Sequence, residues 1–139
     1  MGLLSGTRPD DLGIAGGRLG QVRTDRWNAV SSTATSSYHQ IAPLAAGPDP
    51  RVTFGLLKQL LEQTPGAQLI QSADNYLYAE FSTKLLKFVD DVEFLLDEPG
   101  AVIQVRSASR LGRKDFGVNR KRIEDLRTQL GANPAKLGN

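Results

Sequence analysis

The chain has 139 residues, of which 40% are hydrophobic and 23% charged, and its net charge is +2. These values are typical of one globular domain, and so small a net charge does not predict a nucleic-acid partner. The chain has no cysteine and one histidine. Disulfides, zinc–thiolate sites and thiol catalysis are therefore excluded, and we expect neither a metal centre nor a cofactor. No apolar run approaches the about 20 residues that a membrane-spanning helix needs, so any membrane attachment is expected to be peripheral.

The first third of the chain predicts an irregular arm followed by a strand and a helix. Residues 1–37 are rich in glycine and serine, which interrupt any periodicity, and we expect an extended N-terminal arm there. A short strand is expected over residues 38–44. Apolar residues then recur at three- and four-residue spacing from Val52 to Leu61, which predicts an amphipathic helix that ends before Pro65.

The rest of the chain predicts four strands and a second helix. The strands are expected at residues 67–72, 76–82, 88–96 and 101–109, with the sequence DEPG as the turn between the last two. A helix follows from Val118 to Leu130, with Gly131 as its stop and residues 132–139 as a flexible tail.

One domain over residues 38–131 therefore has the order (β)αββββα. This is an α+β fold, with an antiparallel sheet of four or five strands and both helices packed on one face. The other face would be open to solvent, a ligand or a partner.

The predicted hairpin places a carboxylate among apolar residues. If its turn pairs Leu96 with Ala101, Asp90 lies opposite Ser107 and points to the apolar side of its strand, because side chains alternate along a strand. A carboxylate on that side needs hydrogen-bond donors or a cation. The candidate donors are Ser107, Ser109, Arg110 and the last loop.

Asp91 and Glu93 point to the opposite side of the same strand. In this register Asp91 lies opposite Arg106 and Glu93 opposite Gln104, which favours ion pairing over metal binding. Two hypotheses stay open. The three acidic residues could form an acid/base or cation-binding cluster, or Asp90 could be a buried anchor for the last loop and helix beside an Asp91–Arg106 cross-strand pair.

The last loop and helix are basic, with eight Lys or Arg against three acidic residues from Arg106 to Arg127. Such a region could meet phosphate, an acidic lipid surface or an acidic protein, or it could be a solvated helix face with internal ion pairs. Asp115 or Asn119 could cap the helix. Asn119 and Arg120 at its start could also help to hold an anion.

Three aromatic residues, Trp27, Tyr76 and Tyr78, are expected at the surface. The two tyrosines share one side of a predicted strand and could form a stacking platform for a base. No Lys or Arg accompanies them on that strand, so sheet packing is favoured. Together with Arg8 of the arm, these residues are our candidates for contacts with a partner.

Short words occur in a fixed order along the chain: RPDDLG at residues 8–13, NAVSS at 28–32, IAPL at 41–44, YLYAEF at 76–81, FVDDVEF at 88–94, RSASR at 106–110 and GVNR at 117–120. In these words the chain resembles the domain-of-unknown-function family 1499, which occurs in bacteria and in plastid-bearing eukaryotes. The resemblance implies a fold and a setting in cyanobacterial-type or plastid membranes, and it implies no reaction. Relatives usually carry two cysteines in the arm, where this chain has Arg23 and Ala29. Any metal, redox or disulfide role of those cysteines is therefore lost here.

Two hypotheses on function follow. The favoured one is a non-enzymatic accessory or docking subunit of a larger protein assembly, plausibly a photosystem-associated membrane complex, with contacts made by the arm and the tail. The chain would then be plastid or thylakoid-associated, and otherwise a soluble bacterial or periplasmic protein. The alternative is a small-ligand or anion-binding domain, or an enzyme of unknown reaction, with a pocket lined by Asp90, Arg106, Arg110 and Asn119.

Overall fold

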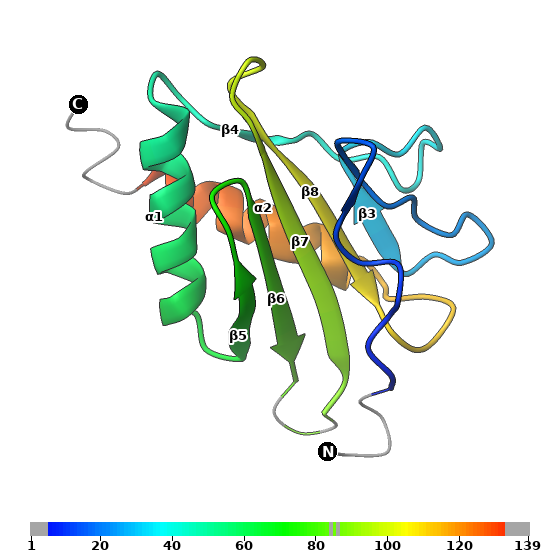
Figure 1. Ribbon diagram of the computed structural model, residues 1–139. Coiled ribbons are helices and arrows are strands. Elements are labelled where there is room, and N and C mark those ends of the chain that lie inside the picture. The colour runs from blue at the N-terminus through cyan, green and yellow to red at the C-terminus, as the bar shows by residue number, and fades with distance from the viewer. Residues whose placement is uncertain (1–5, 84, 86, 133–139) are drawn as a thin grey trace.

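A computed structural model describes residues 6–83, 85 and 87–132, and over these residues the chain forms a six-stranded antiparallel sheet with two helices on one face (Figure 1). The α+β architecture predicted from the sequence is confirmed. The strand order is β3-β8-β7-β6-β5, and β4 pairs with β8 beside β3. The sheet elements are β3 (Ala29–Ser31), β4 (Leu44–Ala45), β5 (Ala67–Ser72), β6 (Tyr76–Ser82), β7 (Val89–Asp97) and β8 (Val102–Ser109). The helices are α1 (Pro50–Gln63) and α2 (Val118–Gly131), and a separate small hairpin joins β1 (Ile14–Ala15) to β2 (Arg18–Leu19).

Helix α1 has clear start and stop signals. The Asp49 carboxylate accepts a hydrogen bond from the Val52 backbone N–H at 3.3 Å, and Pro50 occupies the first position, where its missing N–H costs nothing. Its buried side chains recur at helical spacing: Thr53, Phe54, Leu57 and Leu61. The helix ends at Thr64, before a proline and a glycine that cannot continue it.

Helix α2 begins after a tight loop. The Asp115 carboxylate accepts hydrogen bonds from the backbone N–H groups of Gly117 at 2.9 Å and Asn119 at 3.1 Å. Gly117 occupies the N-cap position, and Asp115, two residues before it, satisfies the free N–H groups. The helix buries a single stripe: Asn119, Ile123, Leu126 and Leu130. Both helices pack on the apolar sheet face to form one core, in which Leu57, Leu77, Phe94, Ile103 and Ile123 are fully buried.

The hairpin between β7 and β8 has a register two residues away from the predicted one. Leu96 pairs with Ile103 instead of Ala101, because the four-residue turn covers residues 98–101 and not the predicted residues 97–100. The Asp97 carboxylate accepts the Gly100 N–H at 3.1 Å in this turn, and Ala101 adopts a left-handed backbone with φ of 54°. A shift by two preserves which side each residue faces, but it changes its cross-strand partner.

The outermost strand β5 is irregular. Its pairing with β6 shifts register between Leu69 and Gln71, so that Ile70 stands outside the regular ladder. Such a bulge adds a residue to one strand and increases the local twist.

The predicted arm requires correction. Residues 29–31 form β3, which pairs with β8, whereas the strand expected over residues 38–44 is limited to Leu44 and Ala45 in β4. Residues 8–20, which we name the strap, cross the sheet face opposite the helices (Figure 1). The sheet face that was expected to be open is therefore partly covered by the chain itself. The predicted tail lies, after Ala132, outside the described residues. Within the described part of the chain, no helix has the length and hydrophobicity needed to cross a bilayer.

Candidate functional site

Most of the predicted site residues, together with Glu80 and Arg122, form two polar clusters on opposite sides of the sheet. Residues of the outer cluster lie under the strap: Tyr76, Tyr78, Glu80, Asp91, Glu93, Arg106 and Arg110. Residues of the inner cluster lie between the sheet and α2: Asp90, Ser107, Ser109, Asn119 and Arg122. Alternation along β7 and β8 causes this division, since neighbouring residues point to opposite faces.

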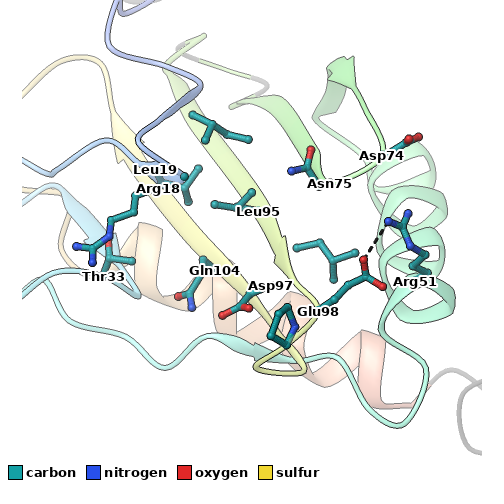
Figure 2. A pocket seen from close by; sticks show the side chains of 14 residues that line it. Arg18, Leu19, Thr33, Arg51, Asp74, Asn75, Leu95, Asp97, Glu98 and Gln104 are labelled. Atoms are coloured by element: carbon teal, nitrogen blue, oxygen red, sulfur yellow. Dashed lines mark ion pairs between the residues drawn. The ribbon is translucent and has the colours of Figure 1, made fainter.

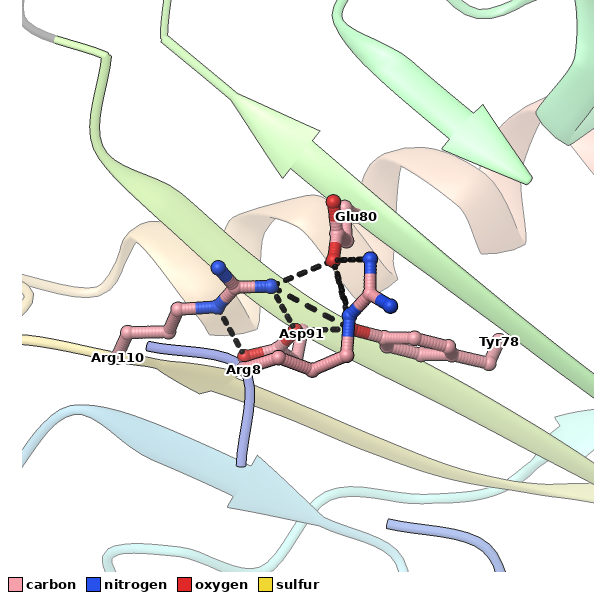
Figure 3. Close-up of polar contacts among 5 residues, drawn as sticks. All are labelled: Arg8, Tyr78, Glu80, Asp91 and Arg110. Carbon is pink, nitrogen blue, oxygen red and sulfur yellow. Dashed lines mark hydrogen bonds and ion pairs between the residues drawn. The ribbon is translucent and has the colours of Figure 1, made fainter. Parts of the chain in front are cut away.

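Arg110 is the centre of one half of the outer cluster (Figure 3). Its Nε donates to Asp91 Oδ2 at 2.9 Å, and its Nη2 donates to Glu80 Oε2 at 2.6 Å. The Tyr78 hydroxyl donates to the other Asp91 oxygen at 2.5 Å. Arg8 of the strap adds a second cation on Glu80, with its Nε 2.8 Å from Oε2. Two cations therefore balance two carboxylates, and the strap supplies one of them.

Glu93 is the centre of the other half and is only 1% exposed. Its carboxylate accepts hydrogen bonds from the Tyr76 hydroxyl at 2.5 Å, Arg106 Nη1 at 3.3 Å and the Gly13 backbone N–H at 2.7 Å. Arg106 also pairs with Asp11 of the strap, with Nη2 2.8 Å from Oδ2. The strap thus completes the hydrogen bonding of buried charges, which a covering apolar segment could not do.

The protonation states of this cluster suit a structural role. Burial, with hydrogen bonds to carboxylates, raises the pKa of the Tyr76 and Tyr78 hydroxyls well above the ordinary value. Burial acts to raise the pKa of Glu80, but hydrogen bonds from Arg8, Arg110 and Tyr78 outweigh it and hold that pKa below its usual value. At neutral pH the tyrosines are hydrogen-bond donors and Glu80 is a charged acceptor.

The inner cluster joins three parts of the chain. The fully buried Asn119 of α2 donates through Nδ2 to the Asn28 carbonyl at 3.0 Å and to Ser109 Oγ at 2.9 Å. Its Oδ1 accepts from Ser107 Oγ at 2.6 Å. This one side chain therefore connects the segment before β3, strand β8 and helix α2.

Asp90 is the buried anchor that was one of the two hypotheses. Its Oδ2 lies 2.7 Å from Arg122 Nη2 of α2, which is the cation it requires. The sequence analysis missed Arg122 as this partner. The predicted Asp91–Arg106 pair is not formed, because the two-residue register shift places Glu93 opposite Arg106 and Ala108 opposite Asp91.

The pocket predicted from Asp90, Arg106, Arg110 and Asn119 does not form. Asp90 and Asn119 lie on the helix side of the sheet, whereas Arg106 and Arg110 lie under the strap. The anion site that was one possibility at the start of α2 is not formed either. Asp115 accepts the N–H groups there, and Arg120 donates to the carbonyls of Tyr38 and Gln40.

The aromatic residues divide into buried and exposed ones. Tyr76 and Tyr78 were expected at the surface but are only 3% exposed, because Leu19 of the strap packs against them. They cannot form a stacking platform in this arrangement. Trp27 is 42% exposed.

A groove remains on the part of the outer face that the strap leaves uncovered (Figure 2). It has a volume of about 720 Å³ and lies between the strap hairpin and the β7–β8 turn. Arg18, Thr33, Asn75 and Gln104 line it, and an ion pair of 2.9 Å between Arg51 and Glu98 closes one side. Sequence reasoning named none of these residues as a candidate site residue.

The opposite end of the sheet carries a surface from which sequence reasoning singled out only Trp27. We name it the loop end and define it by its exposed apolar side chains: Trp27, Tyr38, Leu85, Phe88, Leu111, Phe116 and Val118. Leu85 is 90% exposed and Phe116 is 91% exposed. Cavities of about 480 Å³ and 350 Å³ flank Phe116 on the sides of Trp27 and Phe88, so all of these residues except Leu85 border one continuous surface, and Leu85 lies in the same loop as Phe88.

The fold and its two clusters define an α+β domain whose ionisable residues are used to hold its own segments together. Among the described residues, no group of three or more His, Asp or Glu side chains could hold a metal ion. The chain belongs to the family described as Protein of unknown function (DUF1499), whose family model matches residues 21–130. The strap lies before the matched region. Searches of curated proteins and of solved structures find no match.

Proposed function

We propose that this protein is a non-enzymatic accessory subunit that docks on a larger assembly, a photosystem-associated complex of a photosynthetic membrane. The observation that carries the proposal is the loop end. Monomeric soluble proteins rarely expose a continuous apolar surface with several large side chains, and where they do, it marks a site of attachment. Phe116 and Leu85 each leave about nine-tenths of their surface in solvent.

The polar clusters support the non-enzymatic part of the proposal. Among the residues that the structure describes, no buried side-chain nitrogen or oxygen lacks a hydrogen-bond partner. Glu93 is covered by the strap, Asp91 is bound by Arg110, and Asn119 is enclosed against α2. Asp90 borders the cavity beside Phe88, but it is only 7% exposed and is paired with Arg122. An acid, base or nucleophile must reach its substrate within hydrogen-bond distance, and these groups are buried and bound to other parts of the chain.

The sequence analysis placed the contacts with a partner in the arm and the tail, and the proposal places them in the loop end. Arg8, Asp11 and Gly13 contact the chain's own sheet, so the loop end replaces the arm as the docking surface. The photosynthetic setting is supported by the resemblance to a family that occurs in plastid-bearing eukaryotes.

Affinity isolation tests the proposal. The native protein would carry a C-terminal tag, be cross-linked in intact membranes before gentle solubilisation, and be purified with its bound proteins. We expect stoichiometric recovery with one large complex. A chain recovered alone, from the soluble fraction and without cross-linked proteins, would contradict the proposal and would direct attention to a ligand in the groove of Figure 2.

A further inference from the structure

We infer that the loop end binds an anionic lipid surface. The inference rests on the proposed function, because it takes the loop end as the docking surface and names what that surface contacts: the lipid around the assembly and not one of its proteins. It is argued from the backbone of Phe116, the placement of cations around it and the engagement of nearby carboxylates.

Phe116 has an unfavourable backbone conformation, and its side chain makes few contacts with the rest of the chain. Its φ is 53°, in the left-handed region that bulky residues rarely adopt. The side chain is 91% exposed, so burial against the rest of the protein does not offset this strain. A bilayer would bury the ring and would supply the missing apolar contact.

Four of the seven exposed apolar residues lie on two loops at one end of the sheet, and both loops border the same cavity (Figure 1). One loop follows β6 and carries Leu85 and Phe88, and the other follows β8 and carries Leu111 and Phe116. The backbone N–H of Trp27 donates to the Arg113 carbonyl at 2.5 Å, which fixes Trp27 beside the second loop. Apolar side chains on adjacent loops can enter the headgroup region together without a change of fold.

Cations surround these apolar residues. Lys87 lies in the first loop, and Arg113 and Lys114 lie in the second. All three are exposed, and no carboxylate among the described residues lies within ion-pair distance of them. Their charge is therefore available to a negative partner.

The nearby carboxylates are engaged elsewhere. Asp115 caps α2, and Asp90 pairs with Arg122 at 2.7 Å. Asp125 pairs with Lys121, also at 2.7 Å. The loop end is therefore apolar and cationic, which is the composition that anionic bilayers attract.

The position of Lys114 favours lipid over protein. Lys114 lines the cavity between Trp27, Tyr38 and Phe116, at the middle of the surface. Lysine is depleted from the centres of protein–protein interfaces. Lysine among aromatic residues is instead common where proteins meet the headgroups of a membrane.

The chain contains its own reporter for a binding experiment. Trp27 is the single tryptophan of the sequence and lies within the loop end. Purified full-length protein would be titrated with vesicles of phosphatidylcholine and with vesicles of an equal mixture of phosphatidylcholine and phosphatidylglycerol. We expect a blue shift of tryptophan emission and co-flotation with the mixed vesicles only, and both are expected to weaken as salt is added.

Four variants locate the binding surface. Phe116→Ala is expected to weaken binding to the mixed vesicles about tenfold, by analogy with burial of an aromatic ring. Lys87→Gln and Lys114→Gln are each expected to weaken it about fivefold, from the attraction of one basic residue to an anionic surface. Val52→Ala removes a 51% exposed apolar side chain from α1 and serves as the control, with unchanged binding expected.

The outcomes separate this inference from the proposed function. It is overturned if the protein does not bind the mixed vesicles, or if Phe116→Ala and the lysine variants bind as tightly as Val52→Ala. If Phe116→Ala abolishes co-isolation with the assembly but leaves vesicle binding unchanged, the loop end contacts protein, and only the lipid inference fails. If vesicle binding behaves as expected but no proteins co-isolate, the lipid inference is supported and the proposed accessory-subunit function fails.

Discussion

Phe116 departs from the usual behaviour of a phenylalanine in both its burial and its backbone conformation. Its ring makes little contact with the chain, and its backbone lies in a region that glycine occupies at no cost. The next residue, Gly117, also has a positive φ, of 84°. The local chain path is therefore compatible with glycine at both positions.

Replacement of Phe116 by glycine is expected to preserve or increase stability. The change relieves about 1 kcal/mol of left-handed strain and removes almost no buried contact. We expect the free energy of unfolding, measured by urea denaturation, to stay the same or rise. Lys121→Gly in α2 is the control and should lose about 1 kcal/mol, because it adds glycine to a helix. A comparable loss in Phe116→Gly would show that the ring is part of the folded core.

The depressed pKa of Glu80 gives a pH dependence with a definite sign. The folded-state pKa lies below the ordinary value of 4.5, so the stability from ionised Glu80 is complete above about that pH and is lost as the pH falls through the folded value. Glu80→Gln lacks this contribution at every pH. The difference in unfolding free energy between the native protein and Glu80→Gln should therefore be largest at neutral pH and should shrink on acidification below pH 4.5. A difference that is constant from neutral pH into this acidic range would contradict the assignment.

At the level of elements, the strap is held mainly by polar contacts to buried residues of the sheet. Gly20 lies close against Arg106 at the end of the strap. A Cβ at residue 20 would stand 2.7 Å from Arg106 Nη1 and 3.0 Å from the Asp11 carbonyl oxygen. Arg106 would have to move, which would disturb its contacts with Glu93 and Asp11.

Two glycine-to-alanine changes are therefore expected to act in opposite directions. Gly20→Ala should loosen the strap, with faster amide exchange at Gly13 and a lower unfolding free energy. Gly55→Ala lies in α1 with open space around its Cβ, and it should raise the unfolding free energy by about 1 kcal/mol. Unchanged exchange at Gly13 in Gly20→Ala would show that the strap does not depend on Arg106.

Periodicity and turn residues were sufficient to predict most elements. β5 and β6 match the predicted residue ranges, and β7, β8, α1 and α2 differ by a residue or two at their ends. β3 was not predicted because three residues are too few to show alternation. The hairpin register was wrong because the sequence DEPG does not reveal that Ala101 belongs to the turn.

The site was less predictable than the fold because its contacts are long-range. The sheet face to which each carboxylate of β7 points was predicted correctly from the alternation of side chains, because a two-residue register shift preserves that face. The hydrogen-bond and ion-pair partners of the carboxylates could not be predicted in this way, because Arg122 comes from a helix, and Arg8 and Gly13 come from the strap. Burial of Tyr76 and Tyr78 could not be foreseen, since no pattern in the strap indicates that it returns across the sheet.

On the scale of the whole molecule, Asn119 connects three segments that are distant in the sequence. It bonds the backbone of Asn28, two serines of β8 and the cap of α2. Because it is fully buried, its loss leaves several polar groups without partners.

Asn119→Ala is expected to lower the unfolding free energy by about 2 to 4 kcal/mol, as for other buried polar groups with several partners. Asn75→Ala is the matched control, because Asn75 is exposed in the β5–β6 turn, and it should change stability by less than about 0.5 kcal/mol. Both are measured by chemical denaturation. A loss in Asn119→Ala no larger than that in Asn75→Ala would mean that the inner cluster does not hold the segments together.

The bulge in β5 has a consequence for self-association. β5 is an edge strand of the sheet, and such strands offer unpaired backbone groups to other chains, which leads to sheet extension and aggregation. The register shift between Leu69 and Gln71 interrupts the regular spacing of these groups and twists the edge. A second molecule therefore finds no continuous template along β5, so this edge is protected against edge-to-edge polymerisation.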